Sequence, residues 1–316
     1  MAKNSAAADQ QLTGSEIVLK AMIDQGVDTV FGYPGGAVLP LYDAMFAENA
    51  ISHFLVRQEG GAVHMAEGYA RSTGKVGVVL VTSGPGATNA VTGLTDALMD
   101  SIPLVCFTGQ VPTHLIGNDA FQEADIVGIT MPITKHSFLV KRAEDIPGAI
   151  AAAYEIASTG RPGPVLVDIT KDAQQSSGEF VWDPSPVRLP GYRPKLRASE
   201  AEYQRAVELI NGSKRPIIFA GHGVMLSGAM DLVRELAERA NIPIAMTLLG
   251  IGSFPALHPL NLGMMGMHGE AWVNQAIQEA DLLLAFGMRF DDRVTGNTKT
   301  YAPNARKIHI DIDPAE

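Results

Sequence analysis

One carboxylate and one glycine-rich loop stand where they could do chemistry. Glu59 lies at a predicted strand-to-helix junction, where the positive end of the helix dipole favours a negative charge. A carboxylate held there among apolar residues can accept or deliver a proton, although a charge that only stabilises the first helical turn fits the same pattern. The loop at residues 83–89 (SGPGATN) follows a predicted buried strand and begins a helix, but Asn89 replaces the third glycine of the dinucleotide pattern. Taken alone, this loop favours a structural turn over a phosphate site.

Two other residue patterns suggest chemistry less strongly. His64 and Glu67 have the spacing of half a zinc motif, but no second histidine completes it, so we predict no metal ligand in the chain. The single cysteine, Cys106, lies in an apolar run at residues 102–107, which favours a core position over a nucleophilic one. One thiol forms no internal disulfide, so we expect a reducing, cytoplasmic environment.

The composition limits the kinds of protein that this chain can be. Its 316 residues are 46% hydrophobic and 18% charged, which predicts two domains with substantial cores. The formal net charge of -10 argues against a nucleic-acid partner, because phosphate binding needs clustered Lys and Arg. No run of 18 apolar residues occurs, so we expect no membrane span.

Apolar strands alternate with helices along the whole chain, which predicts parallel sheets covered on both faces. In the first half we expect strands at residues 28–31, 51–56, 76–82, 102–108 and 164–169, with helices at 13–26, 59–72, 87–99 and 146–158. In the second half we expect strands at 216–220, 242–245, 282–286 and 307–312, with helices at 199–211, 229–240 and 271–279.

The fold class is therefore α/β, with two doubly wound parallel-sheet domains. Residues 1–12 are polar and predict a disordered tail, and residues 13–172 form the first domain. A proline-rich, aperiodic stretch at residues 173–198 is the predicted linker, and residues 199–316 form the second domain.

Several motifs, in order and with ordinary spacing, resemble the acetohydroxyacid (acetolactate) synthase family. In the first half they are GYPGG at 32–36, RQE at 57–59, TSGPGATN at 82–89, DAFQE at 119–123 and RPGPVLVD at 161–168. In the second half they are GHG at 221–223, GMMGMHG at 263–269 and MRFDDRVTG at 288–296. The resemblance implies a pyrimidine-binding domain for thiamin diphosphate followed by an FAD-binding middle domain.

The resemblance also implies an activity and assigns roles to residues. Glu59 matches the glutamate that hydrogen-bonds the aminopyrimidine ring of thiamin diphosphate and so promotes loss of the thiazolium proton, and Gln122 matches a residue close to the reacting centre. The implied reaction decarboxylates pyruvate and transfers the two-carbon unit to a second 2-oxo acid, pyruvate or 2-oxobutyrate, in valine and isoleucine biosynthesis. Gly36 matches a cofactor-pocket position, and the matches to substrate-contacting positions are Phe121, Lys171, Met267 and Arg293.

The implied FAD contacts gather mostly in the second half. They are Arg161, Gly221, Gly223, Thr247, Leu248, Met267, His268, Gly287, Arg289, Asp291, Arg293, Val294, Asp311 and Ile312. Leu249 departs from a glutamine found in some members of the family, so one flavin contact would differ. Without the resemblance, plainer roles remain open: core packing for Phe121 and His268, a solvated charge for Lys171, and a surface ion pair with Asp291 or Asp292 for Arg293.

The family also has a third domain, which binds the diphosphate through Mg²⁺ with a Gly-Asp-Gly motif that this sequence lacks. The chain therefore looks truncated, and we expect it to be inactive alone. The resemblance implies a homodimer or tetramer, with a small regulatory subunit as a further partner. Two alternatives remain: a sister thiamin diphosphate carboligase or decarboxylase, and a non-catalytic FAD-binding or assembly module.

Overall fold

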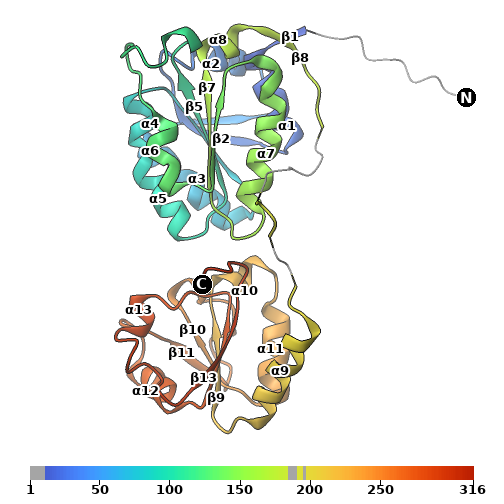
Figure 1. Ribbon diagram of the computed structural model, residues 1–316, viewed down its shortest axis with the longest axis vertical. Coiled ribbons are helices and arrows are strands. Elements are labelled where there is room, and N and C mark those ends of the chain that lie inside the picture. The colour runs from blue at the N-terminus through green and yellow to red at the C-terminus, as the bar shows by residue number, and fades with distance from the viewer. Residues whose placement is uncertain (1–10, 184–190, 195–196) are drawn as a thin grey trace, which may run out of the picture. The chain divides into compact units, whose positions relative to one another are not determined.

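A computed structural model describes residues 11–183, 191–194 and 197–316 of the chain. The chain divides between Arg193 and Pro194 into two compact units, each built on its own parallel sheet (Figure 1). Among the described residues no helix has the length and apolar character needed to cross a membrane.

Six parallel strands form the sheet of the first unit, in the order β3-β2-β4-β5-β7-β6. Their bounds are β2 (Thr29–Tyr33), β3 (Ser52–Leu55), β4 (Gly77–Val81), β5 (Leu104–Gln110), β6 (His136–Val140) and β7 (Pro164–Thr170). Every residue of β4, β5 and β7 is buried, as expected where helices cover both faces of a parallel sheet.

Helices cover the two faces of this sheet in separate groups (Figure 1). One group is α1 (Gly14–Asp24), α2 (Leu39–Phe46), α7 (Ile146–Ser158) and α8 (Lys171–Gln175); the other is α3 (Glu59–Thr73), α4 (Pro85–Asn89), α5 (Val91–Met99) and α6 (Ile126–Thr130). Successive residues of β4 alternate between the two cores, since Val78 packs with the first group and Val79 with the second. Cys106 is fully buried in the second core, which confirms the core position expected for it.

The second unit repeats the same architecture with five parallel strands, in the order β11-β10-β9-β12-β13. Its strands are β9 (Pro216–Ala220), β10 (Ile244–Met246), β11 (Asn261–Met264), β12 (Leu282–Phe286) and β13 (Arg306–Ile310). Its helices are α9 (Glu200–Gly212), α10 (His222–Leu226), α11 (Met230–Ala240), α12 (Ala271–Glu279) and α13 (Asp292–Thr295). The predicted fold class, two parallel α/β domains, is confirmed.

The structure differs from the predicted boundaries at both ends of the first unit. Strand β1 (Gln11–Thr13) pairs antiparallel with β8 (Ser177–Glu179), so Gln11 and Leu12 are not tail and residues 177–179 are not linker. This pairing satisfies backbone groups of both segments, and Leu12 packs against the core. The rest of the predicted tail, residues 1–10, and residues 184–190 and 195–196 of the predicted linker lie outside the described residues.

Two helical glycines test how closely α3 is packed. A Cβ on Gly93 in α5 would lie 2.5 Å from Val63 Cβ in α3, whereas a Cβ on Gly68 in α3 would meet nothing within 4 Å. Gly93→Ala should therefore destabilise the first unit by about 1–3 kcal/mol through overpacking, and Gly68→Ala should stabilise it by about 0.5–1 kcal/mol through helix propensity. Urea unfolding of the two variants measures both effects; equal shifts of one sign would contradict this packing.

Candidate functional site

Loops from neighbouring strands meet at the carboxyl edge of the first sheet. Strand β2 has β3 on one side and β4 on the other, so the chain reverses its direction of strand addition there, which is where ligands bind in open α/β sheets. Beyond these strands, Ala37 N donates to Thr82 Oγ1 at 3.3 Å. A Cβ on Gly35 would lie 2.5 Å from Thr82 Cγ2, so the two loops pack together only because residue 35 has no side chain.

Glu59 lies at this edge as the first residue of α3, the helix that follows β3. It is 9% exposed, and Asn89 Nδ2 donates to its Oε2 at 2.9 Å. Gln58 caps the same helix by accepting from Gly61 N at 2.9 Å, and the helix dipole favours the buried charge. The other oxygen, Oε1, is 3.5 Å from where a Cβ on Gly86 would stand, so glycine backbone forms the wall beside it. Sequence reasoning treated Asn89 as a departure from a glycine pattern and missed this contact.

The loop that carries Gln122 packs on the same glycine-rich turn. Gly84 has φ +56°, and a Cβ there would lie 2.6 Å from the carbonyl oxygen of Gln122. Gln122 itself has φ +55°, a left-handed conformation that is unusual for a residue with a side chain. Phe121 is 87% exposed in this chain, so the core-packing alternative for it is wrong. The structure thus brings Gln122 and the turn next to Glu59 together.

Glu123 stabilises this loop through hydrogen bonds to the loop's own backbone. Its carboxylate accepts hydrogen bonds from Ala120 N at 2.9 Å and from Gly117 N, and Glu123 N donates to Ala120 O at 3.0 Å. The backbone donors, with Gly117 first, lower the pKa of Glu123. The loop therefore keeps its shape through a carboxylate that stays ionised at neutral pH.

A buried carboxylate, Asp168, lies in the sheet beneath this loop. It is 1% exposed, and it accepts from Thr108 Oγ1 at 2.7 Å and from Gln110 Nε2 at 2.9 Å. Burial raises the pKa of Asp168 to about 6, and the two donors oppose that rise. Gln110 Nε2 also donates to Ala124 O at 3.0 Å, which connects the network to the loop that carries Gln122. An acid inside the apolar strand at 164–170 was the signal that could have predicted this network.

Two more residues at this edge follow β7. Lys171, half-buried, is the first residue of α8 and so lies at the carboxyl end of β7. Gln174 is fully buried and donates through Nε2 to Ala37 O at 2.9 Å, which fixes the loop beside Gly36. A Cβ on Gly36 would meet nothing within 4 Å, so this position faces open space.

His64, Glu67 and Asp96 form a separate polar group on α3 and α5. His64 Nδ1 lies 2.7 Å from Glu67 Oε2 and 3.7 Å from Asp96 Oδ2, and the ligand atoms all lie within 4.8 Å of one another. Burial raises the pKa of Glu67, and its hydrogen bond to His64 opposes the rise. An ordinary hydrogen bond between adjacent turns of α3 accounts for this proximity, and the prediction of no metal ligand stays a prediction.

The predicted FAD residues of the second unit gather at the carboxyl edge of its sheet. Gly221 and Gly223 follow β9, and Gly287 follows β12, the strand on the other side of the reversal point. Gly223 N donates to Gly287 O at 2.9 Å, and a Cβ on Gly223 would lie 2.7 Å from Gly287 Cα. Thr247 follows β10, and its N–H donates to Ala220 O at 3.1 Å, beside an exposed Leu248.

Met267 and Arg293 are held side by side at this edge. Met267 N donates to Arg293 O at 2.7 Å, and Arg293 Nη1 lies 3.5 Å from Met267 Sδ. Asp291 caps α13 by accepting from Arg293 N and Val294 N, while Arg293 Nε lies 3.9 Å from Asp292 Oδ2. The predicted surface ion pair with Asp292 is therefore present, but both of its side chains are mostly exposed.

The remaining predicted FAD residues have different surroundings. His268 is exposed, so the alternative of a core histidine is wrong. Arg289 follows β12, and Asp311 and Ile312 follow β13, where all three are half-buried. Arg161 belongs to the first unit, where its Nε donates to Ser101 Oγ at 2.9 Å.

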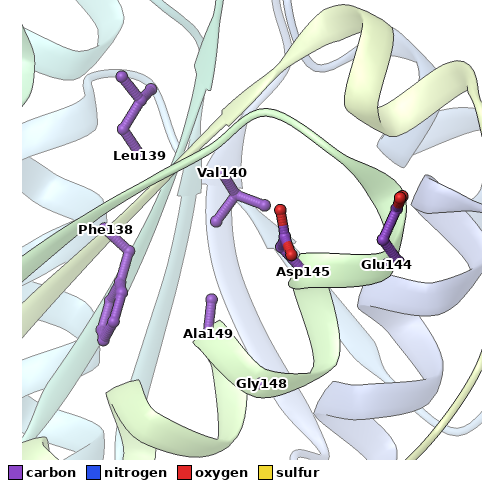
Figure 2. Close-up of a pocket in the computed structure, with 7 residues that line it drawn as sticks. All are labelled: Phe138, Leu139, Val140, Glu144, Asp145, Gly148 and Ala149. Atoms are coloured by element: carbon purple, nitrogen blue, oxygen red, sulfur yellow. The ribbon is translucent and has the colours of Figure 1, made fainter. Parts of the chain in front are cut away.

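A crevice in the first unit lies away from the predicted site residues. It is lined by Phe138, Leu139 and Val140 of the edge strand β6 and by Glu144, Asp145, Gly148 and Ala149 at the start of α7 (Figure 2). None of these residues carries a predicted role, so we assign no chemistry to this crevice. Two of them are acidic.

Fold and site together define a doubly wound α/β protein with a cofactor-type site at the carboxyl edge of each sheet. The chain belongs to the thiamine pyrophosphate enzyme family. Residues 12–129 match the family's N-terminal TPP binding domain, and residues 203–316 match its central domain. The resemblance to thiamine pyrophosphate enzymes is thereby confirmed.

The chain is similar to acetolactate synthase large subunits from distant organisms. It is 54% identical to that of Mycobacterium tuberculosis over 307 residues, which are 97% of this chain and 50% of the relative. It is 51% identical over 307 residues to isozyme 3 of Escherichia coli and 52% identical over 307 residues to a probable large subunit of Methanocaldococcus jannaschii, and it covers 53% and 52% of these relatives. These matches cover 96% of the chain, which thus spans about half the length of the curated relatives it matches.

Protonation of Asp168 should link the stability of the first unit to pH. Its pKa rises from 3.8 to about 6 on folding, so between these values the folded chain holds a proton that the unfolded chain has released. Raising the pH from about 4 to about 6 therefore removes on the order of 2 kcal/mol from the free energy of unfolding. Residue 168 does not titrate in Asp168→Asn, so the free energy of unfolding of this variant should not fall in this way. The free energy of unfolding of the parent chain should therefore fall by that amount relative to that of the variant. Urea unfolding across this range measures it; a constant difference would show that Asp168 does not titrate there.

Proposed function

We propose that this chain provides the thiamine pyrophosphate and FAD sites of an acetolactate synthase catalytic subunit. The reaction would be a transferase reaction that moves a two-carbon unit from pyruvate to a second 2-oxo acid, pyruvate or 2-oxobutyrate. The observation that carries the proposal is the buried Glu59 carboxylate, fixed by Asn89 and walled by Gly86 inside the matched TPP binding domain. The 50–54% identity to acetolactate synthase large subunits supports the choice of reaction within the family.

Glu59 has the surroundings that proton chemistry on a flat cofactor ring needs. Thiamine pyrophosphate, when bound, supplies the electron sink for decarboxylation. Asn89 fixes one carboxylate oxygen of Glu59 and leaves Oε1 on the side of Gly86, where glycine backbone permits a ring to approach closely. Burial limits the access of water, which strengthens the hydrogen bond that Oε1 would make to a ring nitrogen. Glu59 thus serves as the catalytic carboxylate.

The other residues of the first edge form the surroundings of the reacting atoms. Gln122 would reach the reacting centre from the loop above the Gly84 turn, since its backbone packs on that turn. Gly36 faces open space and Phe121 is exposed, as a pocket wall requires. Lys171 lies at the end of β7, where its charge would attract an anionic 2-oxo acid. We assign Mg²⁺ and the diphosphate to no residue of this chain.

The second unit fits FAD at the reversal point of its sheet. Because Gly223 and Gly287 have no side chains, the loops after β9 and β12 pack closely, and no side chain at these positions would keep a pyrophosphate from their backbone. The same edge carries Arg289, Asp311 and Ile312 for the rest of the dinucleotide. Because the proposed reaction has no net oxidation, FAD would have a structural role. Arg293, with Met267 beside it, would receive the carboxylate of the second substrate.

The domain and partner assignments follow from the same proposal. The first unit, including β1 and β8, would be the pyrimidine-binding domain, and residues 199–316 of the second unit would be the FAD-binding middle domain. A cytoplasmic homodimer or tetramer, with a small regulatory subunit, is the expected assembly.

Acetolactate formation from pyruvate tests the proposal. The chain is assayed with thiamine pyrophosphate, Mg²⁺ and FAD, both alone and joined to the part of the Escherichia coli relative that it does not cover. Glu59→Gln should lower turnover at least about a hundredfold, because it removes a proton-transfer group. Glu67→Gln, a buried glutamate on the same helix, is the matched control and should keep activity within a few-fold of the parent chain.

Retention of turnover in Glu59→Gln would refute the assigned role of this residue. If neither form makes acetolactate although FAD binds, a non-catalytic flavin-binding module becomes the better description.

FAD binding to the chain is tested separately, by quenching of flavin fluorescence. Gly287→Ala would place a Cβ 2.6 Å from Gly223 Cα, so affinity should fall at least roughly tenfold. Gly296→Ala is the matched control, because Gly296 has φ +56° against +55° for Gly287, yet a Cβ there meets nothing within 4 Å. Both variants put a side chain at nearly the same positive φ, so an equal loss of affinity in the two would contradict an FAD site at the reversal point.

A further inference from the structure

Gln110 connects the interior of the first sheet to the loop that carries Gln122. Its Nε2 donates to two acceptors, Asp168 Oδ2 at 2.9 Å and Ala124 O at 3.0 Å. Its Oε1 accepts from Val111 N at 2.9 Å. Gln110 is 5% exposed; its contacts with Asp168 and Val111 are buried, and its contact with the half-buried Ala124 is partly buried.

These contacts determine which way the Gln110 amide faces. Asp168 offers an acceptor and Val111 offers a donor, so only the observed orientation satisfies both. A flipped amide would place its oxygen against the Asp168 carboxylate and its NH2 group against Val111 N–H. Two acceptors and two donors would then face each other. With Asp168 and Val111 both satisfied in this orientation, the second hydrogen of Gln110 Nε2 is directed to Ala124 O.

The loop needs an anchor at this point because its conformation is strained. Gln122 and Asp119 both have positive φ, +55° and +52°, and a left-handed residue with a side chain costs about 1–2 kcal/mol. Glu123 holds the loop's amino-terminal side through Ala120 and Gly117. Ala124 comes directly after this clamp, and the Gln110 amide holds its carbonyl.

We propose that Gln110 is a positioning residue, which sets the place of Gln122 against the Gly84 turn beside Glu59 by anchoring Ala124. The role of Gln122 in turnover rests on the proposed function; the anchoring of the loop does not. Asp168 acts one step further away, by orienting the amide of Gln110. Neither residue touches the reacting atoms.

Hydrogen exchange of the full chain tests the anchor directly. Gln110→Met keeps the volume but removes the amide, so exchange of the amides of residues 117–124 should rise about tenfold. Gln110→Asn is the second variant, because it stays polar but is one methylene too short to reach Asp168 and Ala124 together. Thr108→Val is the matched control: it removes the other hydrogen bond to Asp168 and leaves the bond to Ala124, so exchange in this loop should stay within about twofold of the parent chain.

Turnover separates positioning from general stability. In the form that makes acetolactate, Gln110→Met should lower kcat roughly tenfold with less change in KM, and in a Gln122→Ala background the same change should cost less than about twofold. Thr108→Val should have the same effect in both backgrounds. Unchanged loop exchange in both Gln110 variants, an equal rise in Thr108→Val, or additive losses with Gln122→Ala would each overturn the proposal. If no form makes acetolactate, the proposed function fails and the exchange measurement still decides whether Gln110 anchors the loop.

Discussion

Glycine backbone packed directly against a neighbouring loop is the constraint on which both candidate sites depend. In the first unit, Gly35 against Thr82 and Gly84 against Gln122 bring three loops to one edge of the sheet. In the second unit, Gly223 against Gly287 does the same between the strands on either side of the reversal point. Parallel strands deliver loops to a common edge in any doubly wound fold, but they leave room for side chains there. Because glycine has no side chain, the loops lie closer together at these positions, which brings their polar groups near one another.

Two of the buried acids of the first unit, Asp168 and Glu59, differ in what surrounds them, and their chemistry follows from this. Asp168 lies in the interior of the sheet, and the groups that bond it are neutral donors, so its ionisation is opposed by burial. Glu59 stands at a helix amino terminus, with Asn89 on one oxygen and glycine backbone beside the other. Asp168 therefore has the surroundings of a structural group, whereas Glu59 lies where the helix dipole favours a charge and has one oxygen beside the backbone of Gly86.

The sequence predicted the central strands well, because buried strands appear in it as continuous apolar runs. Strands β9 and β12 and helices α7 and α12 have the predicted bounds, whereas β6 and β11, whose residues are mostly only half-buried, were missed. Glu59 could be singled out from its place at a strand-to-helix junction. Its contact with Asn89 could not, because the two residues are 30 positions apart, with helix α3, strand β4 and two loops between them. The hydrogen bond from Gln110 to Ala124 could not be predicted either, because an irregular loop of strained residues has no hydrophobic periodicity.

In the proposed function Arg293 receives an anion, although the chain has a net charge of -10. Its backbone is fixed, because its carbonyl accepts from Met267 N and because only a glycine fits at position 266, where a Cβ would lie 2.7 Å from that carbonyl. Its side chain is 69% exposed, and the ion pair with Asp292 is long, at 3.9 Å. Exposed pairs of this kind contribute about 0–1 kcal/mol, so a carboxylate that binds the guanidinium through two hydrogen bonds displaces Asp292 at little cost. The fixed backbone with a loosely paired guanidinium therefore favours the substrate-binding role over the surface ion pair.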